Sequence, residues 1–135
     1  MFKILAVEDN PAILDFYVEF FTEFEYQVIT AEDALAAIAR YKESSPDIVI
    51  LDLDIPGGGG MLVYETIRTN LKMDTPVIFS TGKPEELAAL KDLKNAEALG
   101  KPTPPEVLMN TVQKLQTELL KKKKNRVPPP PPPHR

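Results

Sequence analysis

Short apolar runs alternate with amphipathic segments along most of this chain. The runs at residues 3–7, 27–30, 47–51, 76–80 and 96–99 are predicted strands. The third run is apolar at consecutive positions after Asp47, as strands are when helices cover both faces of a parallel sheet. The fifth is poor in β-branched residues and is the weakest of the five.

Helical spacing predicts a helix after each strand. Pro11 suits the first turn of the first helix, where its missing N–H is harmless. The apolar positions of this helix, read as core, are Ile13, Phe16, Tyr17, Phe20, Phe21 and Phe24. Thr30 and Asp33 resemble a capping box. The second helix that they open is expected to turn Leu35, Ile38 and Ala39 inward.

The remaining helices are predicted at residues 62–71, at 84–93 and from Pro104 or Pro105 onward. One face of the last helix carries Leu108, Val112, Leu115 and Leu119. Five strand–helix units with short loops predict an α/β fold, a doubly wound, five-stranded parallel sheet of the (βα)5, flavodoxin-like kind.

The chain has 135 residues, the size of one domain, and no cysteine, which excludes disulfides and thiolate metal sites. No apolar stretch approaches the roughly 18 residues of a membrane-spanning helix, and the N-terminus does not resemble a signal peptide. These features predict a soluble, cytoplasmic protein.

The formal net charge is −4, yet six of the sixteen basic residues and no acidic residue lie in residues 121–135. The remaining body is strongly acidic, so we do not expect it to bind nucleic acid directly. The basic run 121–126 and six consecutive prolines at 128–133 predict a disordered tail or linker after a domain at residues 1–120. A recognition function for the prolines is the less favoured alternative.

Polar residues follow four of the predicted strands. Glu8 and Asp9 follow the first, Asp52 the third, Thr81 the fourth and Lys101 the fifth. Because parallel strands end at the same edge of a sheet, these side chains are expected to meet there. Three carboxylates at one place repel each other unless a cation intervenes, and hard oxygen ligands suit Mg²⁺. Lys101 and Thr81 would contact a phosphoryl group, and Asp52 would attack phosphorus as the nucleophile.

Together these motifs resemble the receiver domain of two-component response regulators over residues 2 to about 120. The resemblance rests on the acidic pair Glu8-Asp9, the run from Asp47 through Asp52 to Pro56 with Gly60 after it, Thr81 after residues 76–80, and Lys101-Pro102.

The resemblance implies that Asp52 is the phosphoacceptor, loaded from a phosphohistidine on a histidine kinase or histidine phosphotransfer protein. It implies Mg²⁺ ligation by the side chains of Asp9 and Asp52, by Glu8 mostly through water, and by the main-chain carbonyl of Asp54. Thr81 and Lys101 would contact the phosphoryl group.

The resemblance further implies a cis Lys101–Pro102 peptide bond, and side chains of Asp54 and Lys83 that tune hydrolysis of the acyl phosphate. The domain would be a signalling module rather than an enzyme, with only self-directed phosphoryl transfer and slow autodephosphorylation. Phosphorylation would switch binding to an unknown downstream protein, in a monomer or a phosphorylation-dependent dimer, away from the membrane.

Other interpretations stay open at this stage. The family often carries an aromatic residue three positions before the lysine, where this chain has Ala98, so a phosphorylation-independent scaffold of the same fold is the alternative function. Asp52-Leu-Asp54 also resembles the Asp-x-Asp of haloacid-dehalogenase-like phosphatases, although that motif usually follows a first strand. Asp52 alone would also suit a turn cap, and the glycines at 57–60 lack the Lys-Ser/Thr of a phosphate loop.

Overall fold

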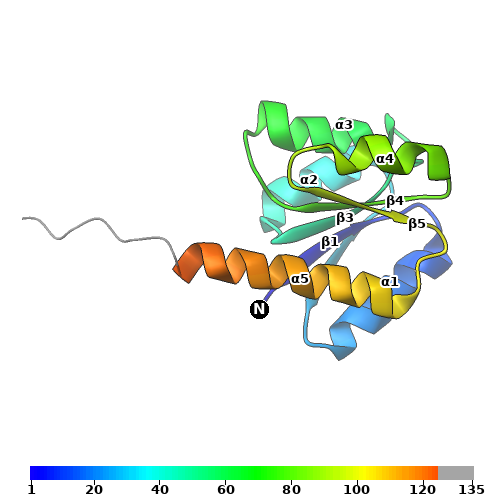
Figure 1. Cartoon of the computed structure of the whole chain (residues 1–135). Coiled ribbons are helices and arrows are strands. Elements are labelled where there is room, and N and C mark those ends of the chain that lie inside the picture. Colours follow the sequence, from blue (N-terminus) through cyan, green and yellow to red (C-terminus); the bar gives the residue numbers. More distant parts are fainter. Residues whose placement is uncertain (125–135) are drawn as a thin grey trace, which may run out of the picture. The chain divides into compact units, whose positions relative to one another are not determined.

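The computed structural model describes residues 1–124, apart from the side chains of Pro84 and Lys124. Its centre is a parallel sheet with the strand order β2-β1-β3-β4-β5 (Figure 1). The strands are β1 (Lys3–Val7), β2 (Gln27–Ala31), β3 (Ile48–Asp52), β4 (Val77–Thr81) and β5 (Ala96–Gly100). Every residue of β3 and β4 is buried. The predicted doubly wound, flavodoxin-like sheet is confirmed.

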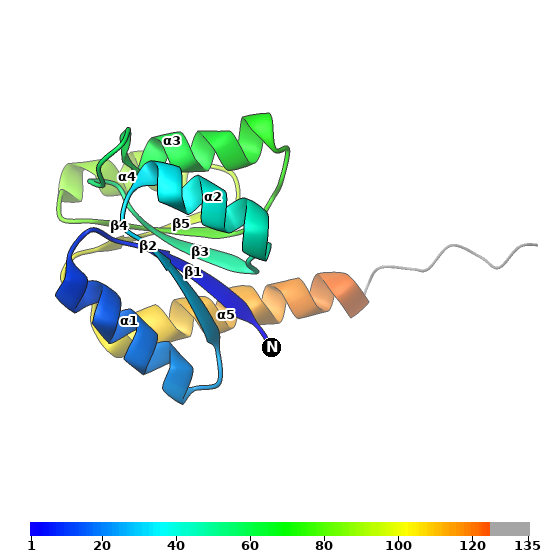
Figure 2. The ribbon, with the colours of Figure 1, turned by 180° about the vertical axis from the view of Figure 1, so that it is seen from behind.

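The helices of the first unit, Met1–Thr103, follow the strands in turn. They are α1 (Pro11–Glu23), α2 (Ala34–Ser44), α3 (Gly59–Glu65) with the π-helical turn η1 (Thr66–Asn70), and the 3₁₀ turn η2 (Pro84–Glu86) with α4 (Leu87–Lys91). Figure 2 shows α1 and α2 from behind. Asn10 caps α1, its side chain accepting from the N–H of Ala12 at 2.9 Å, and Pro11 occupies the first turn as predicted.

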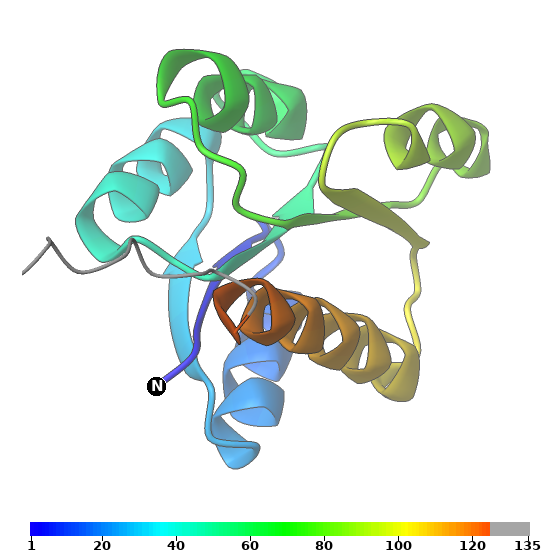
Figure 3. The ribbon, with the colours of Figure 1, turned by 60° about the vertical axis from the view of Figure 1, so that its left-hand side comes forward.

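Helices cover both faces of the sheet. Figure 3 shows α2, α3 and α4 on one side and α1 on the other. The alternation of side chains along each strand supplies both layers: Leu5, Val49 and Phe79 enter the core under α2 to α4, whereas Ile4, Ala6, Ile50 and Ile78 are buried on the opposite face.

The predicted inward face of the second helix was wrong at two of its three positions, since only Ile38 packs against the core. Leu35 is 70% exposed and Ala39 is also exposed, while Ala34, Ala37 and Tyr41 are buried. The capping box was wrong as well, because Thr30 lies inside β2 and Asp33 is the N-cap, accepting from the N–H of Ala36 at 2.7 Å. The packing of α2 against the sheet decides which face of the helix is buried, and this face is turned by about one residue from the predicted one.

The aromatic residues of α1 are not all core. Phe21 and Tyr17 are buried, but Phe16 is 37% exposed and Phe24, the C-cap of the helix, is 52% exposed. Leu14, which the predicted stripe omitted, is buried. Adjacent aromatic residues such as Phe16 and Tyr17 point in different directions from a helix, so a helix this rich in phenylalanine presents some of them to solvent.

The second unit begins at Pro104, and its described part is helix α5 (Pro105–Lys124). This helix includes the first four residues of the segment assigned to the tail. The rest of that predicted tail, residues 125–135, lies outside the described residues. Within the described part of the chain, no helix is both long and apolar enough to cross a membrane.

Candidate functional site

The carboxyl-end edge of the sheet carries the predicted site residues. Glu8 follows β1, Asp52 ends β3, Thr81 ends β4 and Lys101 follows β5. In the sheet, β2 lies on one side of β1 and β3 lies on the other. Glu8 at the end of β1 and Asp52 at the end of β3 therefore flank the point where the strand order reverses. Ligands of open α/β sheets bind at this point.

Three acidic residues approach each other at this edge. Glu8, Asp9 and Asp52 each offer a carboxylate oxygen, and these oxygens lie within 4.8 Å of one another. Glu8 is 1% exposed and Asp52 is 5% exposed, whereas Asp9 faces solvent. Oxygen donors this close, two of them buried, favour a hard divalent cation, which relieves their mutual repulsion. The cluster could therefore bind a metal ion.

Lys101, which follows the edge strand β5, also contacts this cluster. Its Nζ lies 2.6 Å from Glu8 Oε1 and 3.1 Å from Asp52 Oδ2. Burial alone would lower the pKa of Lys101, but its hydrogen bonds to Glu8 and Asp52 and their negative charges raise it. The ammonium is thus held in its charged form against both buried carboxylates.

Glu8 is the titratable group most altered by its surroundings. Burial, followed by the neighbouring Asp52 carboxylate, raises the pKa of Glu8 to about 6, while Lys101 acts in the opposite direction. Glu8 Oε2 accepts from the backbone N–H of Asp9 at 2.9 Å and of Asn10 at 3.3 Å. These bonds fix the orientation of the buried carboxylate.

Thr81 lies at the end of β4 beside this cluster and is 1% exposed. Its Oγ1 accepts from the backbone N–H of Lys83 at 3.1 Å, and its carbonyl accepts from the N–H of Lys101 at 2.8 Å. A hydroxyl that accepts one bond still has its proton to donate. Thr81 is therefore equipped as a hydrogen-bond donor.

The loop after Asp52 is shaped by close backbone contacts. Asp52 Oδ1 accepts from the N–H of Asp54 at 3.1 Å, and a Cβ on Gly60 would lie 2.5 Å from the carbonyl oxygen of Asp52. Only glycine fits this approach, which explains the glycine found at that position. Lys83 Nζ lies 3.8 Å from Asp54 Oδ1, and both side chains are exposed. The Lys101–Pro102 bond is cis, as predicted.

Two residues of this region, Tyr17 and Ser80, were given no chemical function from the sequence, although Ser80 was placed at the end of the fourth strand. Tyr17 was assigned only to the core, yet burial, then the charge of Glu8, raises its pKa, so its phenol faces the acidic cluster. Ser80 is buried beside Asp52. The sequence did contain a signal for both residues: Tyr17 carries a hydroxyl within the apolar face of α1, and Ser80 carries one within the apolar strand β4. Ala98 is buried in the core under α2 to α4.

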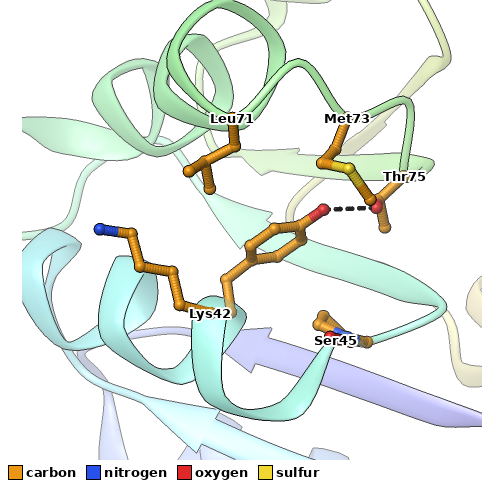
Figure 4. Close-up of a pocket in the computed structure, with 7 residues that line it drawn as sticks. Lys42, Ser45, Leu71, Met73 and Thr75 are labelled. Atoms are coloured by element: carbon orange, nitrogen blue, oxygen red, sulfur yellow. Dashed lines mark hydrogen bonds between the residues drawn. The ribbon is translucent and has the colours of Figure 1, made fainter.

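A separate pocket of about 350 Å³ lies away from this site (Figure 4). Its lining residues are Tyr41, Lys42, Ser45, Pro46, Leu71, Met73 and Thr75. Tyr41 and Thr75 share a hydrogen bond of 2.7 Å between their hydroxyls. Pro46 and Thr75 precede β3 and β4, so this pocket belongs to the opposite edge of the sheet from the acidic cluster.

Comparison with known proteins agrees with this geometry. The family model of the response regulator receiver domain matches residues 4–113. The chain is 32% identical over 117 residues to hybrid signal transduction histidine kinase D of Dictyostelium discoideum, covering 84% of this chain and 8% of the kinase.

It is 27% identical over 120 residues to the phosphate regulon transcriptional regulatory protein PhoB of Escherichia coli, covering 87% of this chain and 52% of PhoB. Among solved structures, the chemotaxis response regulator CheY4 of Vibrio cholerae superposes with a TM-score of 0.77 at 29% identity, covering 85% of this chain and 98% of CheY4. The chain thus spans about half of PhoB and less than a tenth of histidine kinase D.

Proposed function

Because this chain belongs to the response regulator receiver domain family, we propose that Asp52 is its phosphoacceptor in a two-component phosphorelay. The observation that carries the proposal is the contact of Lys101 Nζ with Asp52 Oδ2 at 3.1 Å, beside the clustered oxygens of Glu8 and Asp9. A buried carboxylate with a cation and further acidic ligands at hand is arranged to receive a phosphoryl group.

The proposed reaction moves one phosphoryl group. A carboxylate oxygen of Asp52 forms a bond to phosphorus as the P–N bond of a phosphohistidine breaks. The imidazole nitrogen leaves with the electron pair of that bond and takes up a proton from solvent. The product is an acyl phosphate on Asp52, which water later hydrolyses slowly. This chemistry is directed at the domain itself, which acts as a signalling module.

Magnesium is the proposed metal, since the donors are all hard oxygens and the chain has no cysteine. Asp9 and Asp52 would hold it by side chain, Glu8 largely through water, and Asp54 by its main-chain carbonyl. When bound, Mg²⁺ neutralises phosphoryl charge. Thr81 would donate a hydrogen bond to the phosphoryl group, and Lys101 would pair with one of its oxygens. Asp54 and Lys83, paired at the rim, would tune hydrolysis.

The partners follow from the same chemistry. We propose that a histidine kinase or histidine phosphotransfer protein in the cytoplasm supplies the phosphoryl group, and that phosphorylation shifts the domain toward a state with different affinity for a downstream protein. Monomer and phosphorylation-dependent dimer are both compatible with this switch. The acidic body argues against direct binding of nucleic acid.

A mass measurement tests the acceptor. The purified chain is incubated with Mg²⁺ and phosphoramidate, a small donor with a P–N bond, and its intact mass is recorded. We expect a gain of one phosphoryl group that is absent in Asp52→Asn and in the presence of a chelator. Asp54→Asn, which removes an exposed acid two residues away, is the matched control and should keep the gain. A gain that survives Asp52→Asn would contradict the proposal.

A second measurement distinguishes the scaffold alternative. A pull-down compares the proteins captured by the unmodified chain and by Asp52→Ala, each with and without phosphoramidate and Mg²⁺. The proposal requires a partner whose capture changes with phosphorylation of Asp52. Capture that ignores the donor, the chelator and the substitution would support a phosphorylation-independent scaffold.

A further inference from the structure

Three side chains form a row across the carboxyl-end edge of the sheet. Val7 pairs with Leu51 in the β1–β3 register, so Glu8 comes next to Asp52, and Asp52 pairs with Ser80 in the β3–β4 register. Residues in register on neighbouring parallel strands point to the same face. Ser80 therefore continues the row Glu8, Asp52, Ser80 on the face that α1 covers.

The Lys101 side chain must reach along this row to contact its partners. It follows β5, and β4 lies between β5 and β3 in the sheet. To reach Asp52 Oδ2 and Glu8 Oε1, its side chain passes over the end of β4, where Ser80 and Thr81 lie. Ser80 is thus next to the path of the Lys101 side chain.

The hydroxyl of Ser80 has no hydrogen-bond partner within the described part of the chain. Among the described residues, Ser80 Oγ is a buried side-chain polar atom for which no donor or acceptor lies in bonding geometry, and the residue is only 4% exposed. Folded proteins rarely leave such a group unpaired, and the exceptions call for a functional explanation. A partner that arrives in another state of the site is one such explanation.

The phenol of Tyr17 lies in the same environment. Burial, the charge of Glu8 and the charge of Asp52 raise the pKa of Tyr17, while Lys101 and Ser80 act to lower it. The Ser80 and Tyr17 hydroxyls lie close enough for Ser80 to lower the pKa of Tyr17, but their geometry falls outside that of a hydrogen bond. Tyr17 comes from α1 and is 7% exposed, so its ring is buried near the row rather than in solvent.

We propose that Ser80 is a positioning residue for phosphoryl transfer: when Lys101 exchanges Asp52 Oδ2 for a phosphoryl oxygen, the Ser80 hydroxyl accepts one of its N–H bonds and holds the ammonium over the acceptor. The inference rests on the proposed function of Asp52. An ammonium has three N–H donors, and the contacts with Glu8 and Asp52 use two of them. The third donor and the unpaired Ser80 oxygen are complementary.

Ser80→Ala removes the hydroxyl and leaves no buried group unpaired, so the variant should fold as the unmodified chain does. With Mg²⁺ and phosphoramidate, we expect it to be phosphorylated about tenfold more slowly, the scale of one hydrogen bond to a charged group. Its Mg²⁺ dissociation constant, measured by NMR titration, should be unchanged. Ser80→Thr, which keeps the hydroxyl, should recover the rate to within about twofold.

The Lys101→Met background shows whether Ser80 acts through Lys101. If it does, adding Ser80→Ala to Lys101→Met slows phosphorylation no further, because the interaction is already absent. Equal rates in Ser80→Ala and the unmodified chain would overturn the inference, as would a full further loss in the Lys101→Met background. Failure of the unmodified chain to gain any phosphoryl group would instead overturn the acceptor function of Asp52 and this inference with it.

Discussion

Lys101 and Glu8, 93 residues apart in the sequence, meet with 2.6 Å between Nζ and Oε1. They follow β5 and β1, strands that two others separate in the sheet. Glu8 is 1% exposed and the Lys101 side chain 26% exposed, so the contact is shielded from water. Together with the contact of Lys101 with Asp52, it offsets part of the repulsion among the buried acids.

Lys101→Met should destabilise the metal-free protein. At pH 7 with a chelator, we expect the free energy of unfolding to fall by about 1–3 kcal/mol, less than the roughly 3–5 kcal/mol of a fully buried pair, because Lys101 is partly exposed. Mg²⁺ should bind this variant more tightly, since a competing cation is gone. Denaturant unfolding with and without Mg²⁺ measures both effects.

Lys94→Met is the matched control for this change. Lys94 pairs with Asp74 at 3.1 Å, but both side chains are largely exposed, so its loss should change the free energy of unfolding by less than about 1 kcal/mol. A loss from Lys101→Met no larger than that from Lys94→Met would contradict the buried character of the pair.

The pKa of Glu8 predicts a pH-dependent stability. Because its pKa rises from 4.5 to about 6 on folding, the folded state binds the proton more tightly than the unfolded chain. The resulting stabilisation is fully present below pH 4.5 and is lost as the pH rises through 6, a change of about 2 kcal/mol. Mg²⁺ affinity should change in the opposite direction, since the protonated acid is a poorer ligand.

Glu8→Gln isolates this contribution. The difference in unfolding free energy between the unmodified chain and Glu8→Gln, measured with a chelator from pH 4.5 to 7.5, removes the titration of the other acids. We expect that difference to shift by about 2 kcal/mol across pH 6. A difference that stays constant over this range would show that the pKa of Glu8 does not change on folding.

Gly60→Ala should distort the acceptor loop. Its Cβ would lie 2.5 Å from the carbonyl oxygen of Asp52 and 3.0 Å from Cα of Leu53, and neither backbone atom can move without moving Asp52. We expect a loss of about 1–3 kcal/mol in unfolding free energy and slower phosphorylation. Gly82→Ala is the control, because nothing lies within 4 Å of a Cβ there. Equal behaviour of the two variants would contradict the steric argument.

Tyr41→Phe tests whether the pocket at the opposite edge is independent of the acceptor. The change removes the 2.7 Å hydrogen bond between the hydroxyls of Tyr41 and Thr75 and should cost about 1 kcal/mol of unfolding free energy. The rate of phosphorylation by phosphoramidate should be unaffected. A slower rate in a folded Tyr41→Phe protein would show that the two edges of the sheet are coupled.

Much of the site was accessible to sequence reasoning because parallel topology converts strand ends into neighbours. Once five strands alternating with helices are recognised, Glu8, Asp52, Thr81 and Lys101 must share one edge, whatever their separation in the chain. The consecutive apolar residues at 48–51 and 77–79 are equally informative, since strands buried on both faces are apolar along most of their length.

Helix faces were less predictable. Leu35 in α2 and Phe24 at the end of α1 are apolar yet exposed, whereas Ala34 is buried. Helix propensity and apolar content do not fix, to within one residue, which face of a helix packs on the sheet. The contacts between helix and sheet decide that.

By itself, the sequence determined which elements occur along the chain and in what order. These are five apolar runs that become strands, the acidic pair, the acceptor, the hydroxyl and the lysine. Only the tertiary structure decided how the charges balance. It placed the Lys101 ammonium against Glu8 as well as Asp52 and raised the pKa of Glu8. It also left the hydroxyl of Ser80, next to Asp52 in the sheet, without a partner among the described residues. The reason is physical: desolvation and Coulomb forces depend on distance and burial, which a linear pattern does not contain.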